Sequence, residues 1–222
     1  MNYFLFNHVG SYNHGCEAII RSTENIIKRY DSDSEFVLSS FTPETDCFED
    51  IRIEKSDLKE LTLIEKIIAK FDMIINHSER YALKKMYSPI VKQAEECDIC
   101  ISVGGDTYCY GDNHGVQILT EELKKSGKKV VLWGASIGKE DIDERKIENL
   151  KCFDAIFARE SLTYTLLKEL SVNENVFLFP DPAFCLERED VDPLDGFEKS
   201  NTIGLNVSPL ICRNNEKITD IT

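Results

Sequence analysis

YFLFNHVGSYNHGCEAII, residues 3–20, joins an apolar run to a helical pattern through a loop that contains two glycines. Tyr3–Val9 is short and apolar, which is typical of a strand buried on both faces. Glu17–Tyr30 carries its apolar residues at the spacing of an amphipathic helix. The stretch therefore predicts a strand, a loop and a helix, and the same alternation recurs along the chain.

Short runs rich in Val, Ile and Phe alternate with longer amphipathic stretches after residue 30. Buried strands are expected at 35–41, 98–103, 129–133, 155–158, 176–179 and 203–207, and helices at 116–125, 143–152 and 161–170. Residues 58–96 are too long for one crossover helix, and Pro89 is expected to divide them into two helices. Because apolar strands separated by helices indicate a parallel sheet covered on both faces, we predict an α/β fold with a doubly wound, mostly parallel, Rossmann-like sheet.

The composition bounds the partners and the location of the protein. The 222 residues are 42% hydrophobic, enough for a substantial core, and carry a net charge of −14. This charge argues against nucleic acid and against an anionic membrane surface, although a local cationic pocket remains compatible with a small anionic substrate. The N-terminus lacks the features of a signal peptide, and no stretch approaches the roughly 18 apolar residues of a membrane span. We expect a cytoplasmic protein with no transmembrane segment.

The eight cysteines are expected to be reduced thiols, because no export signal accompanies them. The one close pair, Cys97 and Cys100, falls in an expected strand, where residues three apart point to opposite faces. No second pair of this kind completes a zinc site, so we expect neither a metal nor a cofactor.

The composition changes at residues 187–201, EREDVDPLDGFEKSN, which hold six acidic residues and no apolar periodicity. We expect an α/β domain at 1–186, an acidic linker or loop at 187–201, and at 202–222 the first strand of a truncated C-terminal domain. An unpartnered strand presents free backbone groups, so a homo-oligomer formed through that end is also expected.

Ligands of open α/β sheets bind at the carboxyl ends of the strands, and the first such end is the opening loop. Gly10 and Gly15 have the spacing of a phosphate-binding loop, but the Lys-Ser/Thr pair is absent. A helix N-terminus can hold an anion through its free amides, and Asn13 and His14 add side-chain donors. Glu17 is either a carboxylate that binds a hydroxyl or a partner of its own helix dipole.

Two further loops follow expected strands and carry small or polar residues. Gly104 and Gly105 let a backbone approach a ligand closely, and Asp106 stands at the mouth of the same loop. The alternative is a tight turn with a capping Asp. Ser136 lies among small residues after the fourth strand and is a candidate donor, although close packing of strand on helix explains the same pattern.

The last two strand ends carry charged residues. Arg159 follows an apolar strand, where it either grips a carboxylate or phosphate or pairs with Asp106, Asp181 or another acid of the same edge. Asp181 stands between two prolines beyond the strand 176–179, and its rigid position suits it to orient a neighbour such as Arg159.

Taken in order, these motifs resemble the polysaccharide pyruvyl transferase family over nearly the whole chain. The resemblance lies in the following residues: Gly10-x-x-Asn13-x-Gly15-x-Glu17-Ala18, Gly104-Gly105-Asp106, Trp133-Gly134-Ala135-Ser136-Ile137-Gly138, Ala158-Arg159-Glu160-Ser161, Asp181-Pro182-Ala183-Phe184 and Gly204-Leu205-Asn206-Val207-Ser208-Pro209. It implies a two-domain architecture similar to GT-B glycosyltransferases, with the active site in the cleft between the domains. It also implies transfer of a pyruvyl group from phosphoenolpyruvate to two hydroxyls of a saccharide or lipid-linked saccharide, giving a cyclic ketal.

The resemblance further implies where the catalytic groups lie. The Arg and His that best suit an anion clamp and a general acid belong to the family's C-terminal domain, and none of the four histidines here lies in an Arg-x-His setting. The chain is therefore expected to be an N-terminal half that is inactive alone. The expected substrate-binding residues are Gly10, Asn13, His14, Gly15, Gly104, Gly105, Asp106, Ser136 and Arg159, and the catalytic candidates are Asp106 and Glu17.

Two other functions stay open at this point. One is a GT-B-like glycosyltransferase that uses a sugar nucleotide, and the other is a non-catalytic carbohydrate-binding or scaffold protein. A dinucleotide site is disfavoured, because no G-x-G-x-x-G follows the first strand and no acidic residue ends the second.

Overall fold

The computed structural model describes residues 1–109, 111–188, 190, 192, 195–197 and 201–205. Two compact units are distinguished along the chain, residues 1–186 and 187–222, and the elements below all belong to the first. The strands are β1 (Asn2–His8), β2 (Glu35–Ser40), β3 (Ile51–Lys55), β4 (Ile99–Ser102), β5 (Lys129–Ala135), β6 (Ala155–Ala158) and β7 (Val176–Leu178). The α-helices are α1 (His14–Lys28), α2 (Leu63–Asn76), α3 (Arg80–Met86), α4 (Ser88–Gln93), α5 (His114–Lys125), α6 (Glu144–Leu150) and α7 (Ser161–Glu169). Three short 3₁₀ helices are η1 (Pro43–Thr45), η2 (Lys139–Asp141) and η3 (Pro182–Cys185).

The strands form one sheet in the order β3-β2-β1-β4-β5-β6-β7, and every neighbouring pair is parallel. This confirms the predicted α/β, Rossmann-like class. The chain builds outward from β1 in one direction through β2 and β3, and in the other from β4 through β7. The order therefore reverses between β1 and β4, the position at which open α/β sheets form a crevice for ligands.

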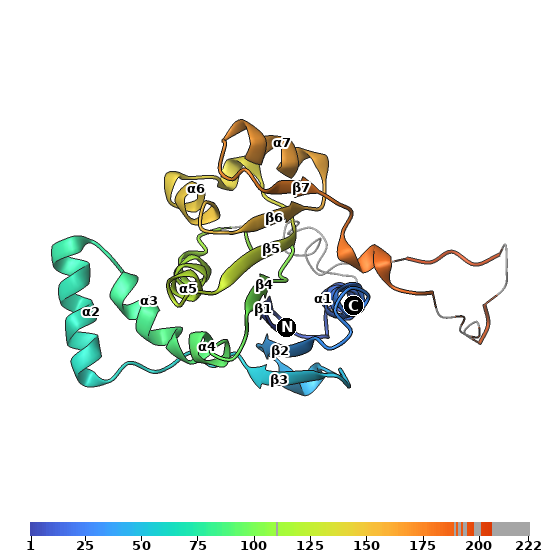
Figure 1. Cartoon of the computed structure of the whole chain (residues 1–222), viewed down its shortest axis with the longest axis horizontal. Coiled ribbons are helices and arrows are strands. Elements are labelled where there is room, and N and C mark those ends of the chain that lie inside the picture. Colours follow the sequence, from blue (N-terminus) through green and yellow to red (C-terminus); the bar gives the residue numbers. More distant parts are fainter. Residues whose placement is uncertain (110, 189, 191, 193–194, 198–200, 206–222) are drawn as a thin grey trace, which may run out of the picture. The chain divides into compact units, whose positions relative to one another are not determined.

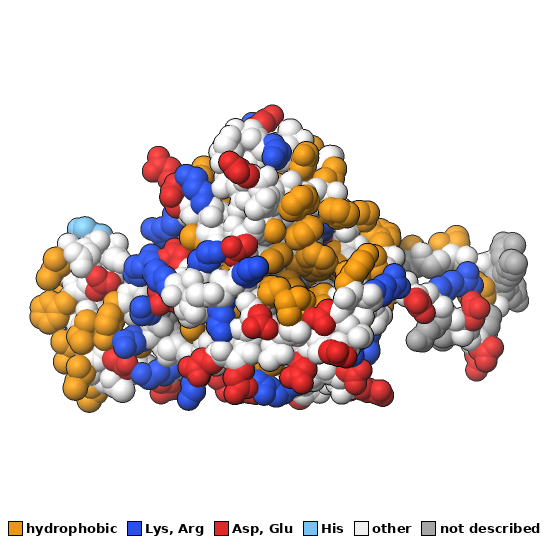
Figure 2. Space-filling model, in the orientation of Figure 1, with side chains coloured by type: hydrophobic (Ala, Val, Ile, Leu, Met, Phe, Trp, Pro, Cys, Tyr) orange, Lys and Arg blue, Asp and Glu red, His pale blue; other side chains and the backbone are white. Residues whose placement is uncertain are grey.

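Helices cover the two faces of the sheet unequally (Figure 1). On one face α4, α5, α6 and α7 bury a core that includes Phe4, Leu132 and Ile156, all fully buried. The other face is packed by α1 around Leu5, Ile20 and Leu38. Beyond α1 this second face carries aromatic side chains of β5, β6 and β7, and the front of the space-filling view shows an apolar surface there (Figure 2).

The elements differ from the expectations in two places. The strand β3 was not predicted, because IRIEK mixes charged residues into a short run and lies at the edge of the sheet. Residues 58–96 form three helices rather than two, because a further break occurs at His77, which adopts the left-handed conformation with φ 50°. The break predicted near Pro89 is present between α3 and α4.

The predicted strand at 203–207 is not confirmed either. Residues 203–205 are in no strand, and 206–207 lie outside the described residues. Most of the segment 202–222, expected to open a C-terminal domain, lies outside them too, so this division and the GT-B architecture stay predictions.

Two leucines of opposite environment test the packing. Leu132 is fully buried in β5, whereas Leu63 at the start of α2 is 79% exposed. Leu132→Ala removes core contacts and leaves a cavity, so it should lower the free energy of unfolding by about 2–5 kcal/mol. Leu63→Ala should change it by less than about 0.5 kcal/mol. Urea denaturation followed by circular dichroism measures both, and equal losses would contradict the outward position of Leu63.

Candidate functional site

The predicted site residues of three loops converge on Arg159, directly after β6. Its Nε donates to Ser136 Oγ at 2.7 Å, and its Nη1 donates to Asp181 Oδ2 at 3.0 Å. Its Nη2 contacts Asp106 Oδ1 in a further ion pair. Arg159 thus links the loops that follow β4, β5, β6 and β7, and the prediction that it pairs with Asp106 or Asp181 is confirmed for both.

The cluster contains one basic and two acidic side chains. Partial burial acts to lower the pKa of Arg159, but Asp106 and Asp181 outweigh it and raise the pKa above the usual value. The guanidinium is therefore held charged between two carboxylates, which leaves one net negative charge. The side chain of Asp106 is 60% exposed and that of Arg159 only 24%, so the carboxylate is the accessible member of the pair.

Two glycines are required by the close packing of this cluster. A Cβ on Gly105 would lie 2.6 Å from Arg159 Nη1, where the guanidinium stands. Gly134 has φ 64°, and a Cβ there would lie 2.8 Å from Pro182 Cδ beside Asp181. Gly104 and Gly105 were predicted to let a ligand approach the backbone, and this stays a prediction; the group that lies against Gly105 is a side chain of the protein itself.

A buried polar network holds the loop that carries Asp106. Tyr108 is fully buried, and its hydroxyl donates to Asn149 Oδ1 at 2.7 Å. The Lys146 ammonium, also buried, donates to the Tyr108 carbonyl at 3.3 Å, and Asn149 donates to the Gln117 carbonyl at 2.9 Å. Sequence reasoning missed this network, because its members lie on α5, α6 and the loop and share no spacing in the chain.

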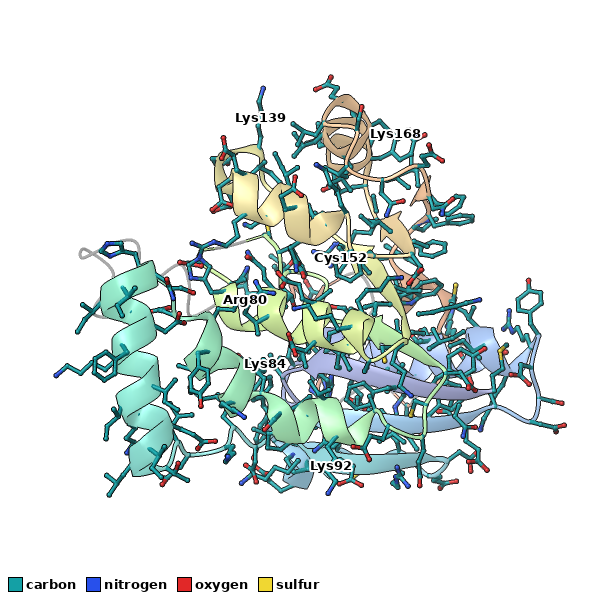
Figure 3. All side chains as sticks on the ribbon, turned by 60° about the vertical axis from the view of Figure 1, so that its left-hand side comes forward. Arg80, Lys84, Lys92, Lys139, Cys152 and Lys168 are labelled. Carbon is teal, nitrogen blue, oxygen red and sulfur yellow. The ribbon has the colours of Figure 1, made fainter. Side chains whose placement is uncertain are left out.

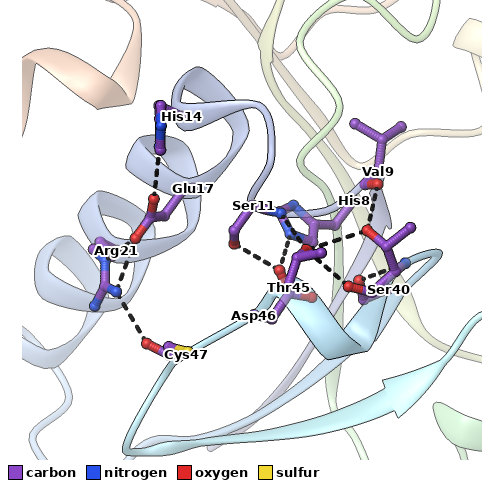
Figure 4. A network of polar contacts seen from close by, with 11 residues as sticks. His8, Val9, Ser11, His14, Glu17, Arg21, Ser40, Thr45, Asp46 and Cys47 are labelled. Atoms are coloured by element: carbon purple, nitrogen blue, oxygen red, sulfur yellow. Dashed lines mark hydrogen bonds and ion pairs between the residues drawn. The ribbon is translucent and has the colours of Figure 1, made fainter.

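The opening loop 9–13 is positioned by a second network, shown in Figure 4. Asp46 accepts from Ser11 Oγ at 2.6 Å and lies 3.0 Å from His8 Nε2, with both His8 and Asp46 almost wholly buried. Gly10, with φ 113°, lies so close to Thr42 that a Cβ would meet its Oγ1 at 1.7 Å. The loop is therefore tied to the segment after β2, which sequence reasoning did not foresee.

Most of the opening-loop candidates have structural partners. Asn13 is the N-cap of α1 and accepts from the Gly15 amide at 3.0 Å. Glu17 accepts from Arg21 Nε at 3.0 Å and lies 3.2 Å from His14 Nδ1, and these hydrogen bonds lower its pKa. Glu17 is thus engaged by its own helix, and of the two predicted roles the structure favours this one over a free hydroxyl-binding carboxylate.

The opening loop nevertheless lies at the same edge as the Arg159 cluster. Burial, and then the nearby carboxylate of Asp106, raise the pKa of the Cys16 thiol in the first turn of α1. A Cβ on Gly104 would also meet the Asn7 carbonyl of β1 at 2.8 Å. The loops after β1 and β4 therefore flank the point where the strand order reverses, with Asp106 beside the N-terminus of α1.

A pocket of about 490 Å³ opens beside Arg159. Arg159, Glu160 and Asp181 contribute its polar groups. Its apolar surface comes from Leu178, Phe179, Pro180 and Phe184. Such a mixture of a few fixed polar groups with apolar walls suits a small organic ligand. Within the described residues no group of three or more His, Cys, Asp or Glu side chains is placed to hold a metal ion.

Comparison with known proteins places the chain in a family. The sequence model of the family described as polysaccharide pyruvyl transferase matches residues 13–217. The comparison with curated proteins found no match to the chain. In the part of the chain that the structure describes, no helix is both long and apolar enough to cross a membrane.

The buried Asp46 network makes a testable contribution to stability. Burial acts to raise the pKa of Asp46, but hydrogen bonds from Ser11, Ser40 and His8 outweigh it and lower the pKa below the usual value. A carboxyl whose pKa is lower in the folded state stabilises the protein above its unfolded pKa of about 3.9, and the contribution is lost as the pH falls through the folded value. Asp46→Asn should therefore cost about 1–3 kcal/mol at neutral pH and clearly less below about pH 3.

Urea unfolding of the variant and the wild type at both pH values measures this difference. The exposed Asp57 provides the control, since Asp57→Asn should change the unfolding free energy by less than about 0.5 kcal/mol. An equal cost of Asp46→Asn at both pH values would contradict the role given to the ionised carboxylate.

Since the match of residues 13–217 spans most of its 222 residues, the chain belongs to the polysaccharide pyruvyl transferase family.

Proposed function

We propose that the protein acts in the transfer of a pyruvyl group from phosphoenolpyruvate to two hydroxyls of a saccharide, and that the Arg159 cluster binds the saccharide. Membership of the family supports the reaction class. The observation that carries the assignment of the cluster is the pairing of Arg159 with both Asp106 and Asp181.

The charge of the cluster supports the acceptor rather than the donor as its ligand. Phosphoenolpyruvate carries a phosphate and a carboxylate, and a binding site for it needs an excess of positive charge. Arg159 is instead matched by two carboxylates at short range. A net negative cluster repels such a donor, whereas carboxylate oxygens accept hydrogen bonds from sugar hydroxyls.

The reaction needs a group that takes a proton from an attacking hydroxyl. The methylene carbon of the donor gains one proton, the phosphate leaves, and two hydroxyl oxygens bond to the former enol carbon. Of the two hydroxyl protons released, one balances the new methyl group and the other the departing phosphate. Asp106 is the exposed carboxylate of the cluster, and Arg159 fixes its orientation, so Asp106 is the proposed acceptor of a hydroxyl proton.

The other elements of the site have supporting roles in this proposal. Ser136 and Asp181 fix the guanidinium, and the N-terminus of α1 supplies backbone amides beside Asp106. The substrate-binding role predicted for Gly10, Asn13, His14 and Gly15 rests on those amides, because Asn13 caps the helix and Gly10 packs on Thr42.

An assay of phosphate release from phosphoenolpyruvate tests the proposal. Release should depend on an added pyranoside with free neighbouring hydroxyls, drawn from a panel because the acceptor sugar is not identified. Asp106→Asn should lower the rate about 10²-fold or more, since it removes the base while leaving a similar shape. Asp33→Asn, an exposed change in the turn before β2, should leave the rate unchanged.

Calorimetric titration separates donor from acceptor. Arg159→Ala should leave the affinity for phosphoenolpyruvate within about threefold, because the cluster carries no net positive charge. A larger loss would place the donor at Arg159 and overturn the assignment of the cluster. Binding of UDP-sugars, together with no release of phosphate from phosphoenolpyruvate, would favour the glycosyltransferase instead.

A further inference from the structure

Helix α2 carries its apolar side chains on the surface of the protein. Among its 14 residues none is buried, and those between 42% and 79% exposed include Leu63, Ile64, Ile67, Ile68, Phe71, Met73, Ile74 and Ile75. The helix itself is well formed, since Thr62 and Glu65 make a complete capping box at its start. Figure 2 shows these side chains as a continuous apolar surface at the left edge of the molecule.

The amphipathic pattern of α2 is turned away from the protein. At about 100° per residue, seven of these side chains lie within an arc of about 140° that runs from Leu63 to Ile68. The polar side of the helix faces the body: Asp72 accepts from the Tyr81 amide of α3 at 3.3 Å, and Glu65 accepts from Lys59 at 2.7 Å. An ordinary surface helix does the reverse and buries its apolar stripe.

The charges around α2 differ from those of the whole chain. Residues 59–92 hold seven Lys or Arg and four Asp or Glu, but Lys59 pairs with Glu65, and Arg80 and Lys84 pair with Glu121 and Glu122 of α5. Lys66 and Lys70 stand beside the apolar arc, both exposed, and neither forms an ion pair with another described residue. Two exposed lysines therefore border the apolar arc in a chain whose net charge is −14.

We propose that α2 docks the protein on an anionic lipid bilayer, with its apolar arc inserted at the interface and Lys66 and Lys70 against the headgroups. A wide apolar arc with lysines along one border is compatible with a helix that lies in the plane of a membrane surface. A two-stranded coiled coil with a second copy would bury only the a and d positions, which is a narrower seam than this arc. This docking is independent of the donor and acceptor of the reaction.

The docking helix is connected to the edge of the sheet where the site lies. Glu79, in the link between α2 and α3, places its Oε2 3.9 Å from His114 Nδ1. His114 begins α5 directly after the loop that carries Gly105 and Asp106. A bilayer held by α2 would therefore lie near the side of the protein on which a saccharide carried by a lipid is accepted.

Co-sedimentation of the whole 222-residue protein with lipid vesicles tests the proposal, and it needs no substrate. Vesicles of phosphatidylcholine with about one third phosphatidylglycerol should bind the protein at least tenfold more tightly than vesicles of phosphatidylcholine alone. Phe71→Glu and, separately, Ile67→Ser should each reduce binding to the anionic vesicles about tenfold or more. The matched control is Leu162→Glu, since Leu162 is 81% exposed on α7, and it should bind like the wild type.

Two double variants separate the effect of the lysines of α2 on vesicle binding from the effect of the net charge of the protein. Lys66→Glu with Lys70→Glu should weaken binding strongly, whereas Lys139→Glu with Lys168→Glu changes the net charge equally and should not. Figure 3 shows Lys139 and Lys168 on the part of the molecule remote from α2. Equal loss in both double variants, or no binding of the wild type, would overturn the proposal.

Light scattering of the same variants tests the alternative that α2 is covered by a second copy of the chain. A wild-type dimer that Phe71→Glu dissociates, together with no binding to vesicles, would assign α2 to a second copy and overturn the proposal. Circular dichroism confirms that each variant is folded, and these outcomes stay distinct from the pyruvyl transfer assay because no donor or acceptor is present.

Discussion

The ion pairs of Arg159 are the interaction on which the arrangement of the site depends. One guanidinium joins four loops that follow four parallel strands, through Asp106, Ser136 and Asp181. Its planar shape offers several donors in fixed directions, which a lysine ammonium does not. The backbone is adapted to this group, because Gly105 leaves the space that the guanidinium fills. Removal of either carboxylate would leave a partly buried charge with fewer partners and would free the loops from one another.

The sheet order explains why these loops meet. All seven strands are parallel, so every loop after a strand lies at one edge, and the reversal between β1 and β4 opens that edge at its centre. The helices after β1 and β4 leave on opposite faces, with α1 on one and α5 on the other. Asp106 and the N-terminus of α1 consequently face the same crevice. The position of the site therefore follows from this topology, and the side chains of the loops then supply its chemistry.

The fold class and the members of the Arg159 cluster could be predicted from the sequence, and some other features could not. Apolar strands and helical spacing are local signals, and a charged residue after an apolar strand of a parallel sheet has only one edge to occupy. Arg159, Asp106 and Asp181 were found in this way. His8, Asp46, Tyr108 and Lys146 gave no local signal, because a buried polar group depends on partners distant in the chain. Asn13 was predicted only as a donor to a ligand, and the role of Glu17 was left open, because capping and binding use the same residue types.

Helix α2 marks a further limit of sequence patterns. The spacing of its apolar residues predicts a helix with one apolar side, but it does not predict which side faces the protein. The polar side has the partners, because Asp72 accepts from the Tyr81 amide of α3 and Glu65 accepts from Lys59 of the segment before α2. Such an arrangement leaves a large apolar area in water, which is unfavourable for an isolated molecule. The exposed Lys66 and Lys70 beside this area, in an otherwise acidic chain, are the feature that favours an anionic lipid surface over another protein as the group that covers it.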